Sequence, residues 1–214
     1  MKKEKILITV KTYPTPSSKY DELVCTAGLR EDGSWVRIYP IEFRKLSYND
    51  HYKKYDWVEV LLERRTSDFR SESFKPKSDL KVVGHIGYDN SWQERKDLVL
   101  KKAKVYTNLT ELIADSKKPK YVSLAVFKPT KIIDFTFEPV DREWSKQDAL
   151  SLIQGNLFEP NSDFKPVRKL PYKFKYKFID DAGKESHLMI EDWELGALFW
   201  KYADNEVIAC QKVK

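Results

Sequence analysis

The stretch from Val24 to Leu46 encodes a strand, a tight turn and a second strand, and it constrains the fold more than any other part of the chain. Glu31-Asp32-Gly33 predicts the turn. The second strand runs from Ser34 to Tyr39, and Pro40 ends it because proline has no N–H to donate to a sheet. We therefore expect a β-rich protein with a hairpin in its N-terminal part.

Side chains of that second strand alternate between two faces. Val36 and Ile38 point to one face and indicate a core, while Trp35, Arg37 and Tyr39 point to the other. An arginine between two aromatic rings can stack on bases and hold phosphate. The same row can also be a surface ladder, or a second buried face whose arginine is paired.

Two more segments alternate in the same way. They are Lys5 to Thr12 and Trp57 to Leu62, and Lys11 and Tyr13 leave the first of them on its non-core side. We expect one shared core that contains Ile6, Ile8, Val10, Val36, Ile38, Val58 and Val60. Further strands are expected over Leu80 to Ile86, Tyr121 to Phe127, Thr130 to Phe137 and the closing stretch EVIACQKVK.

Capping signals mark the helices. We expect them over Ser91 to Lys104, from Asn108 or Thr110, over Ser145 to Gln154, and over Asp192 to Tyr202. Ser91 and Ser145 each precede an acidic residue by three positions, which is the spacing of a capping box. The last helix is apolar nearly all round, so Trp193 and Trp200 are expected in the core.

The run YKFKYKF has the cleanest alternation in the chain and predicts one strand of a hairpin. Its aromatic face consists of Tyr172, Phe174, Tyr176 and Phe178, and its basic face of Lys173, Lys175 and Lys177. Such lysines can contact phosphate, or they can guard the edge of a sheet against aggregation.

Basic residues also gather between residues 63 and 79, where the sequence has no periodicity and predicts an exposed loop. Arg64, Arg65 and Arg70 lie there, and Arg44 lies in an earlier polar arm. A loop of this kind can contact phosphate or be a solvated surface.

Composition limits the class of protein. The 214 residues carry 39 basic and 33 acidic side chains, so a net charge of +6 moderately favours polyanionic partners. Cys25 and Cys210 lie far apart in apolar contexts and are interpreted as buried small hydrophobic residues. The three histidines do not have the spacing of metal ligands, so we expect no metal site and no cofactor. Apolar runs fall far short of the ~20 residues of a membrane span, and the N-terminus does not resemble a signal peptide, so we expect a cytoplasmic protein.

Four stretches carry a family resemblance: KTYPTPSSKYDELVCTAG, DGSWVRIYPIEFRKL, LPYKFKYKF and IEDWELGALFW. They resemble an uncharacterised bacterial family whose members carry KTYP, VCTAG, WVRLYP-FR and EDWE blocks. The N-terminal part is also similar to OB-like β-barrel domains, including those of dual-barrel proteins. Relatives run on past the equivalent of Lys214, so we expect the native sequence to continue there.

Together these features predict a β-rich α+β fold with OB-like or related small barrels and inserted and flanking helices. We expect a barrel lobe over residues 1–138 with a helical arm at about 91–116, and a smaller α+β lobe over residues 139–214 that is truncated at its C-terminus.

The function that the sequence favours is non-catalytic, sequence-tolerant binding of single-stranded RNA or DNA. The candidate residues are Lys11, Tyr13, Trp35, Arg37, Tyr39, Arg44, Arg64, Arg65, Arg70, Lys173, Lys175 and Lys177. One alternative is a metal-dependent nuclease or related phosphate enzyme with Glu191, Asp192 and Glu194, or Asp180 and Asp181, as ligands. Another is a protein-interaction subunit of a larger bacterial complex, because aromatic residues and arginine are typical of interfaces. The oligomeric state stays open.

Overall fold

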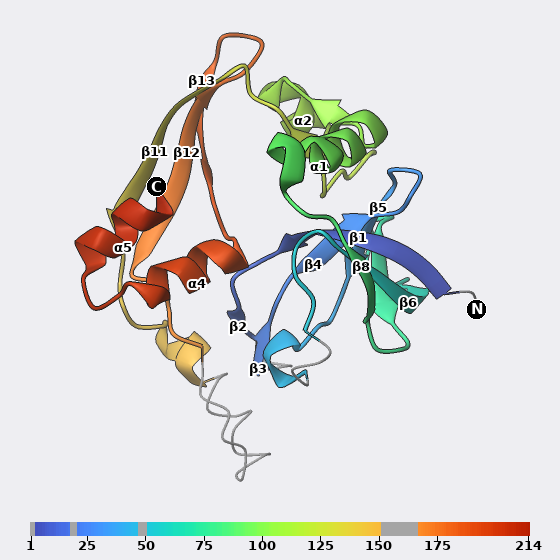
Figure 1. Cartoon of the computed structure of the whole chain (residues 1–214), viewed down its shortest axis with the longest axis horizontal. Helices are drawn as coiled ribbons and strands as arrows, with labels where there is room; N and C mark the ends of the chain where they lie inside the picture. The colour runs from blue at the N-terminus through green and yellow to red at the C-terminus, as the bar shows by residue number, and fades with distance from the viewer. Residues whose placement is uncertain (1–2, 18–20, 47–50, 151–166) are drawn as a thin grey trace.

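The computed structural model describes residues 3–17, 21–46, 51–150 and 167–214. Five strands form a closed barrel: β1 (Lys3–Lys11), β4 (Thr26–Leu29), β5 (Trp35–Ile38), β6 (Asp56–Arg64) and β7 (Ser73–Pro76). They are ordered β1-β4-β5-β7-β6, and β6 pairs back onto β1 (Figure 1). The β5–β7 pair is parallel and the others are antiparallel. This is an OB-like barrel, as predicted, and β8 (Lys81–His85) extends it beside β6.

Six of the seven predicted core residues are confirmed, because Ile6, Ile8, Val36, Ile38, Val58 and Val60 are fully buried in one cluster. The prediction for Val10 is wrong, and so is the solvent-facing side predicted for Lys11. The register of β1 against β4 shifts between Ile8 and Val10, so Thr9 is an extra residue in a β-bulge. Because a one-residue shift exchanges the faces of a strand, Val10 lies outside the core cluster and Lys11 turns inward, 4% exposed.

The exposed loop predicted for residues 63–79 is also wrong in part, because it contains β7. That strand closes the barrel between β5 and β6, with Arg37 and Ile38 pairing with Ser73 and Phe74. The first strand of the predicted hairpin, expected over Glu22–Leu29, is interrupted too. The chain forms a small hairpin of β2 (Thr15–Ser17) and β3 (Asp21–Leu23) before β4 begins.

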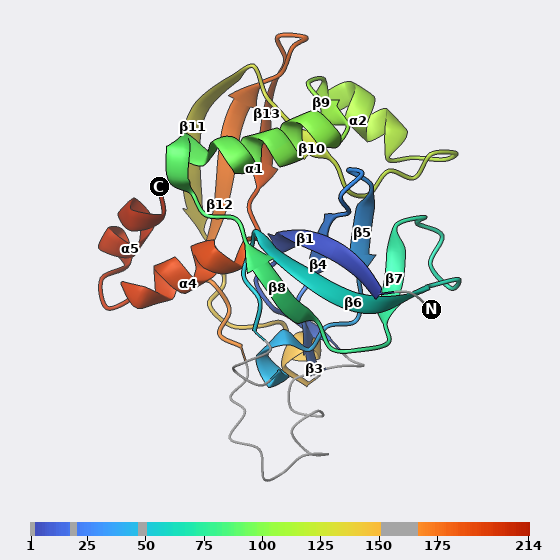
Figure 2. The same ribbon diagram turned by 45° about the vertical axis from the view of Figure 1, so that its right-hand side comes forward.

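A helical layer lies over the barrel, as Figure 2 shows. It consists of α1 (Asp89–Lys102), β9 (Val105–Tyr106), α2 (Leu109–Asp115) and β10 (Val126–Phe127). The strand predicted over residues 121–127 is thus confirmed only for the two residues of β10. Asn108 caps α2 as predicted, since its side chain accepts from Glu111 N. The capping box predicted at Ser91 is wrong, because Asn90, Ser91 and Trp92 have left-handed φ values and kink the start of α1.

The rest of the chain forms a three-stranded sheet of β11 (Lys131–Pro139), β12 (Tyr172–Ile179) and β13 (Glu185–Met189), with α4 (Trp193–Lys201) and α5 (Glu206–Val213). The predicted hairpin β12–β13 is confirmed. Since β12 is the central strand, the edge-strand interpretation of its lysines is wrong. The strand predicted for EVIACQKVK is wrong as well: Asn205 caps a helix there and Ala209 and Cys210 are buried.

Helix α4 begins as predicted, because the Asp192 side chain accepts from Glu194 N and Leu195 N. The helix predicted from Ser145 is described over residues 146–150, where Ser145 Oγ accepts from Asp148 N, and its remainder lies outside the described residues. The stretch 158–171 is rich in proline and polar residues, which predicts a linker or lobe boundary, and only its residues 167–171 are described. No described helix has the length and apolarity that crossing a membrane requires.

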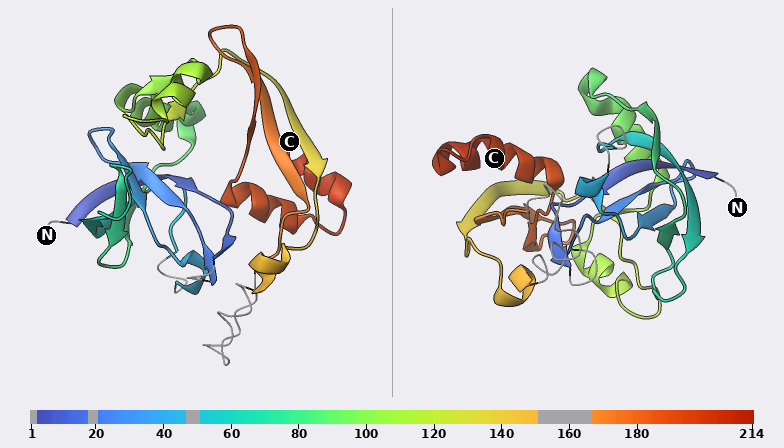
Figure 3. Two further views of the ribbon diagram at one scale, coloured as in Figure 1. Left: turned by 180° about the vertical axis from the view of Figure 1, so that it is seen from behind. Right: turned by 90° about the horizontal axis from the view of Figure 1, so that it is seen from below.

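The barrel and the C-terminal elements meet where α4 begins beside β2 (Figure 3). Thr12 forms an isolated bridge with Asp192, and Tyr13 N donates to Glu191 O at 3.2 Å. Trp193 packs against the barrel core. The loop that leaves β1 is therefore fixed against α4.

Candidate functional site

The predicted site residues lie in three places and not on one surface. Trp35, Arg37 and Tyr39 lie near the arginines of the β6–β7 loop. Lys11, Tyr13 and Arg44 lie near α4, and Lys173, Lys175 and Lys177 lie on β12.

Arg37 is partly covered by the segment that follows α2. Its guanidinium donates to Cys25 Sγ at 2.9 Å and to Ser123 Oγ at 3.0 Å. Ala27 and Leu29, on the same face as Arg37, are buried. A hollow of roughly 370 Å³ remains between the barrel and residues 120–124. The face that carries Arg37 is thus largely engaged within the molecule.

The arginines of the β6–β7 loop hold the loop together. Arg64 donates to the main-chain carbonyl of Arg65 at 2.7 Å and to that of Asp68 at 3.3 Å. Arg70 pairs with Asp68 at 2.7 Å and holds the pKa of that carboxyl well below its ordinary value. The Arg65 guanidinium lies 4.5 Å from the centre of the Tyr39 ring. Their contacts are structural ones.

Two of the three lysines on β12 are paired with described acidic residues, and one is not. Lys175 pairs with Glu138 at 2.6 Å and Lys177 with Glu185 at 2.7 Å, so acids of both neighbouring strands neutralise them. Lys173 is exposed and forms no ion pair with any described residue.

Tyr13 is the centre of a contact that joins three parts of the chain. Trp200 Nε1 donates to Tyr13 Oη at 2.8 Å, and Tyr13 Oη donates to Arg168 O at 2.7 Å. Burial raises the pKa of Tyr13. The Arg168 guanidinium lies 3.6 Å from the centre of the Trp200 ring, a cation–π contact. These contacts fix the orientation of both side chains.

Beside this contact is an open, mostly apolar hollow of roughly 400 Å³, the Tyr13 groove. It is lined by Tyr13, Pro14, Arg44, Val167, Arg168, Trp193, Ala197 and Trp200. Trp193 and Trp200 are only partly buried, so the core position predicted for them is right for one side of each ring only.

Lys11 supports the wall of the groove from inside. Its ammonium donates to Tyr52 O at 3.1 Å and lies 4.2 Å from the Phe43 ring centre and 4.7 Å from that of Trp193. Burial lowers its pKa. Lys11 is therefore a packing residue among aromatic rings and not a surface cation.

The two arginines of the groove differ in their partners. Arg44 pairs with the buried carboxylate of Glu22 at 2.7 Å. Arg168 forms no ion pair within the part of the chain that the structure describes, and it is exposed. Sequence reasoning missed Arg168, because it lies in a stretch that predicted only a linker and its partner Trp200 is 32 positions away.

Four of the five acidic residues of the nuclease hypothesis have structural partners in the described chain, namely Asp180, Asp181, Asp192 and Glu194. Asp192 caps α4 and pairs with Lys54 at 2.5 Å, and Glu194 pairs with Lys54 at 3.1 Å. Burial alone would lower the pKa of Lys54, but the hydrogen bond to Asp192 and the two carboxylates raise it. Asp180 accepts from three main-chain N–H groups. Among the described residues no three His, Cys, Asp or Glu side chains gather as a metal site would require.

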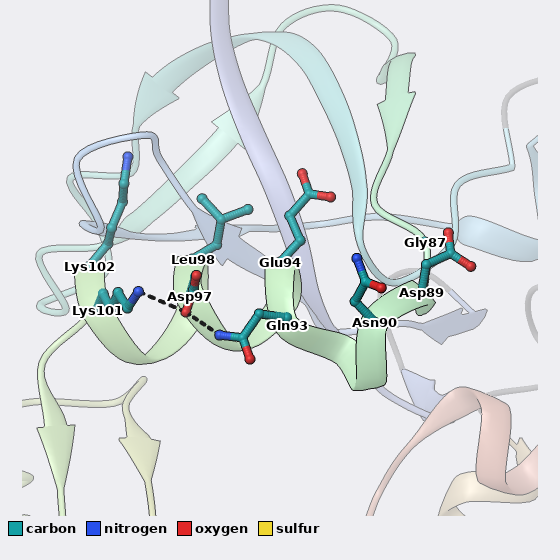
Figure 4. Close-up of a pocket in the computed structure, with 9 residues that line it drawn as sticks. All are labelled: Gly87, Asp89, Asn90, Gln93, Glu94, Asp97, Leu98, Lys101 and Lys102. Carbon is teal, nitrogen blue, oxygen red and sulfur yellow. Dashed lines mark hydrogen bonds and ion pairs between the residues drawn. The ribbon is translucent and has the colours of Figure 1, made fainter.

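A larger hollow, roughly 630 Å³, lies along α1 (Figure 4). Its lining includes Asp89, Glu94, Asp97 and Lys101, and Asp97 accepts from Gln93 and pairs with Lys101 at 3.0 Å. None of the described residues that line it carries an aromatic ring. The Tyr13 groove has the more specific chemistry for a ligand.

The chain matches two sequence families, which share it almost equally. Residues 2–101 match "Domain of unknown function (DUF8758)", and residues 105–214 match "Domain of unknown function (DUF8757)". No curated protein matches the chain. No solved structure matches it either.

Proposed function

The chain belongs to the family described as "Domain of unknown function (DUF8757)", and we propose that it is a non-catalytic module whose Tyr13 groove binds single-stranded nucleic acid with little sequence preference. The groove, rather than the face of Arg37, is the site of this proposal.

The observation that carries the proposal is the position of Arg168. Its guanidinium lies on the Trp200 ring, has no carboxylate partner among the described residues, and borders an apolar groove that Trp193 also lines. Because Arg168 covers one side of the Trp200 ring and the other side packs in the core, a base in the groove can stack on the outer face of the guanidinium plane, whose N–H groups can also hold phosphate. Stacking contributes about 1–3 kcal/mol per base whatever the base is, because every base has a π face.

The barrel supports the same location. Tyr13 and Pro14 lie in the connection between β1 and β4, the first two strands of the ring. In OB-fold barrels the connection between these strands is one of the two loops that contact oligonucleotides. The groove is thus on a part of the barrel that suits this ligand.

Fluorescence anisotropy with a labelled single strand of ~12 nucleotides tests the proposal, since single-strand sites span about 4–16 nucleotides. We expect binding at ~50 mM salt that weakens as salt rises. Arg168→Ala should weaken binding and lower the slope of log affinity against log salt by about one. Lys101→Ala, which removes a charge from α1 in a hollow that shares no lining residue with the groove, is the control and should change affinity little.

Absence of binding by the folded wild-type protein at ~50 mM salt would overturn the proposal. So would equal losses for Arg168→Ala and Lys101→Ala, because they would show a diffuse charge effect and no site.

A further inference from the structure

A second hollow, roughly 240 Å³ and mostly apolar, also borders Tyr13 and Pro14. It is lined by Tyr13, Pro14, Thr15, Val140, Trp144, Lys169, Leu170, Tyr172, Lys173, Met189, Ile190 and Glu191. We call it the Trp144 pocket. It shares Tyr13 and Pro14 with the Tyr13 groove, so the two hollows are neighbours.

The two hollows are built in the same way. In the Tyr13 groove the Trp200 N–H is fixed by Tyr13, and Arg168 lies over the ring. In the Trp144 pocket the Trp144 N–H is fixed by Val167 O at 2.9 Å, and the Lys169 ammonium lies 5.8 Å from the ring centre. Each hollow thus pairs a tryptophan whose polar edge is bonded to protein with one cation near its ring.

Arg168 and Lys169 are consecutive residues, and each lines a different hollow. The main chain at Arg168 is itself held, since its carbonyl accepts from Tyr13 Oη. Lys169 Nζ donates to Glu143 O at 2.8 Å and keeps hydrogen-bonding capacity for an anion, because an ammonium has three donors. This dipeptide therefore places one cation at each hollow.

We infer that the Tyr13 groove and the Trp144 pocket form one two-base site, in which neighbouring nucleotides of a single strand each place a base in one hollow. The inference rests on the proposed function and names the smallest ligand that fills the site, a dinucleotide. The phosphate that joins the two nucleotides lies near Arg168 and Lys169, and Lys173 adds a further exposed cation. Glu191 is the acidic residue of the lining, and it is exposed.

A length series measured by calorimetry tests this inference. The ligands are thymidine monophosphate, the dinucleotide pTpT, the trinucleotide and the ~12-nucleotide strand of the preceding test. For the wild-type protein we expect affinity to rise about tenfold or more from one nucleotide to two, because a second base then stacks, and to rise less steeply from two to three.

Trp144→Leu should abolish the rise between one and two nucleotides and should reduce the affinity for the mononucleotide much less, because the Tyr13 groove remains available to it. Trp144→Phe keeps a stacking surface and should restore most of the rise. Lys169→Ala, which removes no ring, should reduce the affinity for pTpT more than that for the mononucleotide, and it covers the case in which Trp144→Leu does not fold.

The outcomes separate the two proposals. If no strand binds, the proposed function fails and this inference fails with it. If the ~12-nucleotide strand binds but Trp144→Leu and Lys169→Ala bind every length as the wild type does, the proposed function stands and the two-base site is refuted.

Discussion

Gly196 of α4 lies against the ring of Tyr13 so closely that a Cβ on the glycine would stand 2.1 Å from Cδ2 of the tyrosine. No side chain fits between a helix backbone and a ring at that distance. The contact fixes Tyr13 between the barrel and α4, where its hydroxyl accepts a hydrogen bond from Trp200 Nε1 and donates one to the main-chain carbonyl of Arg168.

Gly196→Ala should therefore destabilise the protein, by about 1–3 kcal/mol, the usual range for overpacking. Helix propensity alone predicts the opposite sign, because alanine is favoured over glycine by about 1 kcal/mol inside a helix. Urea denaturation distinguishes the two. In a Tyr13→Ala background the penalty should disappear, and an unchanged penalty there would contradict the contact as its cause.

Tyr13→Phe removes one hydroxyl and leaves the Trp200 N–H and the Arg168 carbonyl without this partner. We expect a loss of about 1–2 kcal/mol in unfolding free energy, mostly from the part-buried bond of the Trp200 N–H, because the bond to the Arg168 carbonyl is exposed. Tyr88→Phe is the control at a 70% exposed tyrosine and should change stability by less than about 0.5 kcal/mol. Equal stability of the two variants would show that the bridge contributes nothing.

Asp180 should make the free energy of unfolding depend on pH in the acidic range. Its carboxylate is 1% exposed; burial favours the neutral form, but the N–H groups of Lys184, Leu109 and Ala182 outweigh this and lower its pKa. The unfolded chain then binds the proton first as pH falls, so the contribution of Asp180 is complete above about pH 4 and is lost below it, through the folded pKa.

Asp180→Asn should consequently be less stable than the wild type at pH 7, and the difference should shrink as pH falls below about 4. Urea denaturation of both proteins at several pH values measures it. A difference that is constant over this interval would mean that the charge of Asp180 is not what the three N–H groups recognise.

Arg64→Lys should loosen the β6–β7 loop without unfolding the barrel. A lysine cannot reproduce the forked donation of Arg64 to the loop carbonyls. Hydrogen exchange at Asp68 N and Ser73 N, which bond within this loop, should become faster. Arg65→Lys is the control, since Arg65 contacts the Tyr39 ring and bonds the loop only through a long hydrogen bond to Ser67 Oγ at 3.5 Å, and it should change exchange at these amides less than Arg64→Lys does.

Alternation of apolar residues was enough to find most of the barrel core, because a local period of two shows which residues of a strand face the core. The residues found in this way are Ile6, Ile8, Val36, Ile38, Val58 and Val60. It was not enough for β7, which has one partly buried aromatic residue, Phe74, and whose pairing with β5 and β6 is set by the closed ring. Nor was it enough for α5, where packing of Ala209 and Cys210 against the sheet overrides the strand propensity of Val207 and Ile208.

The Tyr13 groove shows a second limit of prediction from the sequence. Tyr13 and Arg44 could be proposed from their types alone, but their neighbours Trp193, Trp200 and Arg168 come from segments far away in the sequence. Trp200 predicts a core residue from its helix, and one side of its ring does pack there. That its other side meets Arg168 depends on how two layers join, which no local pattern contains.

The bulge at Thr9 has a consequence beyond the barrel. It acts as a phase shift in the strand: residues before it keep their side, and every residue after it is turned to the opposite one. Deleting Thr9 should leave Val10 paired with Ala27 and Lys11 paired with Thr26, because Thr9 is the residue that has no partner on β4. The strand would become regular, with Lys11 still among its rings and Tyr13 still at Trp200. The extra residue is thus what lets a strand of alternating sequence turn Lys11 inward, and it sets the side on which the groove begins.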